Sequence, residues 1–177
     1  GIVPVVIDRL TRKYPKLIFN VKQSDPVTLR DRELRERNIE LLIGLMAEPI
    51  SDDEIQVEIL FEEKPFVVAG LRNRWARRRK IELSELVDEP WSVGPPDSFA
   101  GSLIADAFRA KGLPPPRINS VTYSIPLHHA LLAKDRFLSI LPGSLLRFSA
   151  DQMLLKVLPV KLPIRPGPIG IAILKSR

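Results

Sequence analysis

The sequence has no cysteine, only two histidines and no long apolar run. Without cysteine the chain can form no disulfide, no thiol nucleophile and no cysteine-based metal site. No apolar stretch approaches the ~20 residues that a membrane-spanning helix needs, and charges appear too early in the first residues for a secretory signal. We therefore expect no membrane partner, while the apolar share of 45% predicts a globular fold.

Motifs for nucleotide binding and nucleophilic catalysis are also missing. The sequence contains no G-x-G-x-x-G, no G-x-x-x-x-G-K-[ST] and no G-x-S-x-G. The histidines, His128 and His129, are adjacent, and neighbouring residues on a helix point about 100° apart, so one metal ion cannot bind both. We place them in a core or an interface, and we expect no enzyme activity, no metal and no cofactor.

The basic excess is concentrated in one segment. Residues 72–80, RNRWARRRK, carry six basic and no acidic side chains, which equals the whole net charge of +6. A surface that neutralises many phosphates would need a broader basic face. We favour a solvated surface loop for this segment over a nucleic-acid patch, which stays open as the alternative.

Strand and helix patterns alternate along the chain. Ile2 to Lys13 has helical spacing, residues 17–23 (LIFNVKQ) alternate as a strand does, and Pro26 to Arg37 is predicted to be a helix. Further strands are predicted at residues 39–45, 55–61, 65–70, 91–93, 117–123, 137–142, 153–160 and 170–174. This order predicts an α/β fold with mostly parallel sheets. The polar break at residues 72–80 and the late pair of strands after Gln152 predict two lobes, between which the chain crosses twice.

Three predicted helices begin directly after predicted strands, near Asp25–Thr28, Asp97–Gly101 and Ser124. In an open α/β sheet such turns lie at the carboxyl ends of the strands, where small ligands bind, and each offers free N–H groups and a positive dipole end. Capping alone explains any single turn. Together the three turns could instead form one anion-binding cleft, and the sequence leaves both interpretations open.

A series of segments in order resembles the effector-binding domain of LysR-type transcriptional regulators. They are GIVPVVIDRLTRKYPKLIFNV, LRDRELRERNIELLIG, LFEEKPFVVAG, RRRKIELSELVDEPW, PPDSFAGSLIADAFRAKGLPPPR, SIPLHHALLAKDRFLSILPGSLL and LKVLPVKLPIRPGPIGIAILKSR. The resemblance implies two Rossmann-like lobes of the type II periplasmic-binding-protein fold, joined by two crossover strands. Residues 1–69 and 153–177 would form lobe I, and residues 70–152 would form lobe II.

The same resemblance implies a function in ligand sensing. It implies a small-molecule effector between the lobes, a cytoplasmic homodimer or higher oligomer, and DNA binding only through an N-terminal helix-turn-helix domain that this chain lacks. The implied effector contacts are Ser24, Asp25, Val27, Thr28, Ser98, Phe99, Ala100, Gly101, Ser124 and Ile125. The alternatives are a transporter's solute-binding protein and a lyase or dehydratase, which can share the fold.

Two departures from the family's pattern bear on the ligand. Asp25 stands where the family commonly has Gly-Ser or Gly-Thr, and a carboxylate there would disfavour an acidic effector unless it faces away or only caps the helix. The family's G-x-G-I is replaced by DRFL, so that Arg136 and Phe137 could alter the wall of the cleft. Both departures concern the class of ligand rather than the fold.

Overall fold

Helices and strands alternate along most of the chain, as the periodicity predicts. The structure, a computed structural model, describes residues 2–24, 28–46, 53–96, 98–148 and 154–175. In chain order the elements are α1 (Val3–Lys13), η1 (Thr28–Leu34), β1 (Leu42–Leu45), β2 (Ile55–Glu63), β3 (Pro65–Gly70), η2 (Leu83–Leu86), β4 (Trp91–Val93), α2 (Phe99–Ala110), β5 (Ile118–Val121), α3 (Ile125–Leu132), β6 (Leu138–Pro142), α4 (Gly143–Phe148), β7 (Leu155–Val157) and β8 (Gly167–Leu174). Within these described ranges no helix is long and apolar enough to cross a membrane.

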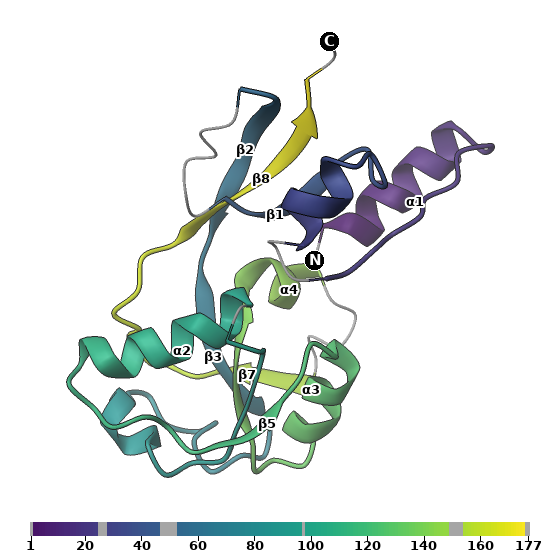
Figure 1. The fold of residues 1–177 in the computed structure, drawn as a ribbon. Helices are drawn as coiled ribbons and strands as arrows, with labels where there is room; N and C mark the ends of the chain where they lie inside the picture. The colour runs from purple at the N-terminus through teal and green to yellow at the C-terminus, as the bar shows by residue number, and fades with distance from the viewer. Residues whose placement is uncertain (1, 25–27, 47–52, 97, 149–153, 176–177) are drawn as a thin grey trace.

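The strands of the described residues form two sheets (Figure 1). The smaller sheet has the order β1-β8-β2 and is antiparallel, and the larger has the order β5-β4-β6-β3-β7. In the larger sheet β4 pairs in parallel with β5 and β6, whereas β3 pairs antiparallel with β6 and β7. The predicted α/β architecture is confirmed, but the prediction of mostly parallel sheets is wrong, because apolar periodicity carries no information about strand direction.

The chain passes between the sheets twice. β2 and β3 are separated only by Lys64, yet β2 pairs in the three-stranded sheet and β3 in the five-stranded sheet. The chain returns between β7 and β8, which also belong to different sheets. The two predicted crossings are therefore confirmed, while the lobe boundaries at residues 69/70 and 152/153 stay a prediction.

Both faces of the five-stranded sheet are covered by apolar side chains. On one face, α2 and η2 pack on the sheet, and the buried rings of Trp91 and Phe108 meet edge to face with centroids 6.0 Å apart. On the other face, Val68, Leu132 and Leu141 form a second buried cluster with α3 and α4 alongside. Sheets covered on both faces are typical of α/β proteins. Because both faces are covered, the sequences of these strands are nearly continuous apolar runs.

The segment that follows α1 departs from the prediction. Residues 17–24 are extended but belong to no strand, so the strand predicted at residues 17–23 is wrong. Ile18 and Val21 are 83% and 67% exposed. A strand needs a neighbouring strand to satisfy its backbone, and no strand among the described residues pairs with this segment. Helix α1, which has no buried residue, likewise projects from the side of the molecule (Figure 1).

The helix predicted from Pro26 to Arg37 is only partly observed. The described part contains a π-helical segment, η1, over Thr28–Leu34, and Leu34 is its one buried residue. Residues 25–27 lie outside the described residues. The highly charged sequence of this stretch offers a narrow apolar face, and in proteins the apolar face supplies most of a helix's stability.

Candidate functional site

The starts of α2 and α3 lie at the same edge of the five-stranded sheet. α2 follows β4 and α3 follows β5, and these two strands are parallel neighbours with Val93 opposite Val121. The amide of Thr122 continues this pairing by donating to the carbonyl of Val93 at 3.0 Å. Ser98 and Ser124 therefore begin their helices beyond adjacent carboxyl ends, and for these two turns the predicted placement at one sheet edge is confirmed.

The turn before α2 is built around the hydroxyl of Ser98. Its Oγ accepts a hydrogen bond from the amide of Gly101 at 3.1 Å and donates to the carbonyl of Pro95 at 2.7 Å. A Cβ on Gly101 would lie 1.9 Å from that same carbonyl oxygen, so the turn closes only with glycine at this position. The cap uses one of the first amides of α2, whereas Phe99 and Ala100 contribute further backbone to this positive helix end.

The turn before α3 is capped in the same way. The Oγ of Ser124 accepts from the amide of Leu127 at 3.3 Å, and the amide of Ser124 donates to Oγ1 of Thr122 at 3.0 Å. Ser124 is exposed, and Ile125, half-buried, is the first residue of the helix. The N-cap predicted at Ser124 is confirmed, and in the turn before α2, where the sequence left the capping residue open, the cap is Ser98. Two exposed or partly exposed helix starts at one sheet edge can attract an anion.

Beneath the second turn lies a buried histidine. His128 is 4% exposed; its Nδ1 lies 2.9 Å from Oγ of Ser92 and its Nε2 lies 3.1 Å from the carbonyl oxygen of Thr122. A carbonyl only accepts, so Nε2 carries the proton and Nδ1 accepts from the Ser92 hydroxyl. Burial lowers the pKa of His128, the hydrogen bond to Thr122 opposes that shift, and the neighbouring charge of His129 adds to it.

The core placement predicted for the histidines is confirmed for His128, but its link to the site was missed. One feature of the sequence could have indicated this link. Ser92 is a polar residue between Trp91 and Val93, in a strand that is buried along its whole length. A buried hydroxyl needs a hydrogen-bond partner, and that requirement points to a polar side chain on the covering helix.

Lowering the pH is expected to destabilise the protein through His128. Because its folded-state pKa is lower than the ordinary value of 6.5, the unfolded state takes up the proton first as the pH falls. The contribution to stability is therefore complete above about pH 6.5 and is lost as the pH falls from there towards the folded-state pKa. Urea unfolding at about pH 7.5 and about pH 5 measures the difference, and His128→Gln should reduce it. An equal pH dependence in both proteins would contradict this assignment.

The candidate contacts at residues 24–28 are less completely described. Ser24 is exposed at the end of the extended segment, and Thr28 begins η1, which contacts β1 of the three-stranded sheet. Asp25 and Val27 lie outside the described residues, as does Asp97. Among the described residues no strand precedes η1, so the strand that the sequence predicted before this helix start is not observed. The convergence of this turn with Ser98 and Ser124 stays a prediction.

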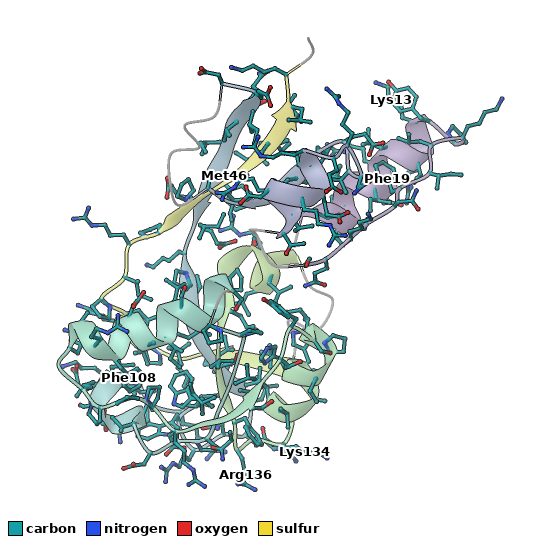
Figure 2. The ribbon with its side chains drawn as sticks, viewed as in Figure 1. Lys13, Phe19, Met46, Phe108, Lys134 and Arg136 are labelled. Atoms are coloured by element: carbon teal, nitrogen blue, oxygen red, sulfur yellow. The ribbon has the colours of Figure 1, made fainter. Side chains whose placement is uncertain are left out.

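The DRFL segment lies at the far end of α3. Asp135 adopts a positive φ of 58°, and its carboxylate accepts from the amide and Nε of Arg72, each at 3.0 Å. Phe137 packs against the second apolar cluster, with the guanidinium of Arg136 5.7 Å from its ring centroid. The segment follows the C-terminus of α3, about 12 Å along the helix from Ser124. Figure 2 shows Arg136 at the end of the molecule opposite Lys13. These side chains therefore lie away from Ser124, and their effect on the wall of the cleft stays a prediction.

Most basic side chains of residues 72–80 face carboxylates. The pairs are Arg72 with Asp135, Arg74 with Glu89, Arg78 with Glu85 at 3.1 Å and Lys80 with Glu82 at 2.8 Å. Arg74 and Arg78 also lie over the ring of Trp75. A loop whose charges are largely neutralised by its own neighbours agrees with the surface-loop interpretation and gives little support to a phosphate-binding face.

The described side chains form no obvious metal or acid-base centre. Across the described ranges, no group of three or more His, Cys, Asp or Glu residues is placed to hold a metal ion. The buried carboxylate of Glu63 accepts from the amide of Ser144 at 3.1 Å, at the start of α4, which gives it a structural partner. The chemistry best matched by the site is the binding of an anion by backbone amides and hydroxyls.

Comparison with known proteins identifies the family. A profile described as the LysR substrate binding domain matches residues 1–177. The HTH-type transcriptional regulator GbpR of Azospirillum brasilense is 27% identical over an alignment of 177 positions, which covers 99% of this chain and 51% of GbpR. The chain spans about half the length of the curated relatives it matches.

Solved structures agree on the fold. The CcmR regulatory domain of Synechocystis PCC6803 in complex with 2-PG matches with a TM-score of 0.79 at 18% identity, covering 99% of this chain and 82% of that one. The BenM effector binding domain with its effector benzoate matches with a TM-score of 0.73 at 23% identity, covering 100% and 79%. The fold is thus the type II periplasmic-binding-protein fold of these domains, and the chain belongs to the LysR substrate binding domain family.

Proposed function

We propose that this chain is the ligand-sensing part of a LysR-type transcriptional regulator and that it binds a small organic anion. The observation that carries the proposal is the placement of two capped helix starts, at Ser98 and Ser124, beyond adjacent strands of one sheet. Family membership adds the regulatory context, since GbpR is named a transcriptional regulator and the BenM domain was solved with benzoate. DNA binding would belong to other parts of the whole protein.

The proposed site lies between two lobes. Residues 1–69 and 153–177 form lobe I in this proposal, and residues 70–152 form lobe II. Lobe II supplies the N-terminal turns of α2 and α3, and lobe I supplies residues 24–28 with Asp25 among them. Ligand binding would favour one arrangement of the lobes and so bias the regulator, which makes the coupling allosteric. The chain acts as a cytoplasmic sensor in this proposal and not as an enzyme or a transport protein.

We also propose that the protein is a homodimer in which a second copy covers α1. Val5 and Val6 are 49% and 44% exposed, and no residue of α1 is buried. Its apolar side chains recur with helical spacing, which predicts a partner for that face. Leu17 and Ile18, also exposed, extend the apolar surface beyond the helix.

A thermal-shift screen tests the ligand site. Small aromatic and aliphatic acids, amino acids and sugar acids are added to the wild-type protein, and at least one should raise the melting temperature. Ser98→Ala and Ser124→Ala should each reduce that rise. A compound at 100 times its Kd stabilises by about 2.7 kcal/mol, and a tenfold loss of affinity roughly halves this.

The rise, and not the melting temperature itself, is the readout, because losing an N-cap alone costs about 0.5–2 kcal/mol. Ser84→Ala, an exposed serine in η2, is the matched control and should keep the full rise. If both cap variants also keep the full rise, the ligand binds elsewhere.

A further inference from the structure

A chain of hydrogen bonds runs from the interior of the five-stranded sheet to the N-cap of α3. The hydroxyl of Ser92 donates to Nδ1 of His128 at 2.9 Å, and Nε2 of His128 donates to the carbonyl of Thr122 at 3.1 Å. Oγ1 of Thr122 in turn accepts from the amide of Ser124 at 3.0 Å. The chain thus links a fully buried residue of β4 to an exposed residue of the candidate site.

This polar chain lies in an otherwise apolar layer. Val68, Leu132 and Leu141 are buried on the same face of the sheet. Ser139, on β6, lies beside Ser92, because their predecessors Leu138 and Trp91 are opposite each other; its Oγ has no partner among the described residues. Apolar packing can hold the face of α3 against the sheet, but it is not directional. Hydrogen bonds are directional, and here they fix the orientation of the turn before α3.

The turn is held from two sides. The amide of Thr122 donates to the carbonyl of Val93, which anchors it to β4 by the backbone. On the second side, the carbonyl of Thr122 accepts a hydrogen bond from Nε2 of His128. The orientation of Ser124 and of the first amides of α3 therefore depends on the side chain of His128.

We propose that His128 is a positioning residue for the effector site: its ring holds the turn Thr122–Ser124 and so aims the first amides of α3 at the bound anion. The proposal rests on the proposed function and adds a residue that does not touch the ligand. His128 is buried and both its ring nitrogens are engaged within the protein. Because the attraction of a helix end falls off within its first turn, a small displacement of that turn weakens anion binding.

Three substitutions in the full-length protein separate positioning from simple packing. His128→Leu introduces an apolar side chain of similar size, which can fill the space of the ring, but it leaves the carbonyl of Thr122 and the hydroxyl of Ser92 without their ring partner. His128→Gln restores an amide that can donate to Thr122. Ser139→Ala is the matched control, since it removes a buried hydroxyl from the same layer that has no partner in the described part of the chain.

Amide hydrogen exchange tests the positioning without any ligand. In His128→Leu the amides of Ser124 and Leu127 should exchange about tenfold faster or more, while His128→Gln should stay within about threefold of wild type. The amide of Gly101 is bonded to Ser98, at the same sheet edge but outside the chain through His128, and should not change. Unchanged exchange at Ser124 and Leu127, or an equal rise at Gly101, would overturn the proposal.

Calorimetric titration with benzoate tests the consequence for binding. Affinity should fall about tenfold in His128→Leu, which is a loss of about 1.4 kcal/mol in binding free energy. It should return to within about threefold of wild type in His128→Gln and stay unchanged in Ser139→Ala. Full affinity in His128→Leu together with a loss in Ser124→Ala would overturn the positioning role. If no acid of the screen binds the wild-type protein, the proposed function fails, and the exchange experiment still decides the role of His128.

Discussion

Trp91→Ala is expected to lower the free energy of unfolding by about 3–5 kcal/mol, which is the range measured when large aromatic side chains are truncated in a core. Trp91 is completely buried, meets the ring of Phe108 edge to face, and donates from Nε1 to the carbonyl of Leu86 at 2.9 Å. Alanine would leave a cavity between α2 and the sheet and would free a buried carbonyl. Because β4 carries the turn to α2, the lost packing also reaches the candidate site.

Urea unfolding of the wild-type and variant proteins measures this loss. A matched pair isolates the hydrogen bond: Trp91→Phe removes a bonded indole N–H, whereas Trp75→Phe removes one that has no partner among the described residues. Trp91→Phe should therefore cost about 1–3 kcal/mol more than Trp75→Phe. If Trp91→Ala costs less than about 1.5 kcal/mol, well below the range for aromatic truncation, Trp91 does not carry the packing assigned to it.

Gly101→Ala is expected to destabilise the protein by about 1–3 kcal/mol or more and to abolish stabilisation by any acid that the screen identifies. The added Cβ would lie 1.9 Å from the carbonyl oxygen of Pro95 and 2.4 Å from that of Gly94. Both neighbours are backbone, so the turn itself must open. Alanine is otherwise preferred in a helix by about 1 kcal/mol over glycine, and the contact reverses this preference.

Gly44→Ala is the control for this substitution. Gly44 lies in β1, and a Cβ there would meet no heavy atom within 4 Å. Its backbone angle is not in the positive range, so alanine should be neutral or should stabilise by up to about 1 kcal/mol through the unfolded state. A neutral Gly101→Ala with retained ligand stabilisation would show that the turn before α2 can widen without loss of the site.

Local features of the sequence predicted the elements that depend on local chemistry. Ser98 and Ser124 cap helices because a hydroxyl placed just before a helix can accept from an amide of its first turn. Gly112, with φ of 65°, follows the end of α2, as expected of a glycine at a helix terminus. Each of these predictions needs only residues within one helical turn of each other.

The errors arose where the structure depends on partners that are distant in the sequence. Residues 17–23 have the alternation of a strand, but a strand forms only beside another strand, and no strand of the described residues lies next to them in either sheet. The prediction that most strands pair in parallel was wrong for the same reason.

By itself the sequence determined the α/β class, the order of most elements and the cap at Ser124, since these follow from periodicity and from contacts within a turn. It also indicated the two crossings, through the polar break at residues 72–80 and the late pair of strands. Only the tertiary structure decided the mixed pairing of the sheets and the hydrogen bonds from Ser92 through His128 to the turn before α3. Ser92 and His128 are 36 positions apart, and the strand pairing joins residues as distant as Leu42 and Ala172. The reason is that strand pairing and buried hydrogen bonds depend on which surfaces meet on folding. The periodicity of side chains along the chain indicates which of them are buried, but not which residues they contact.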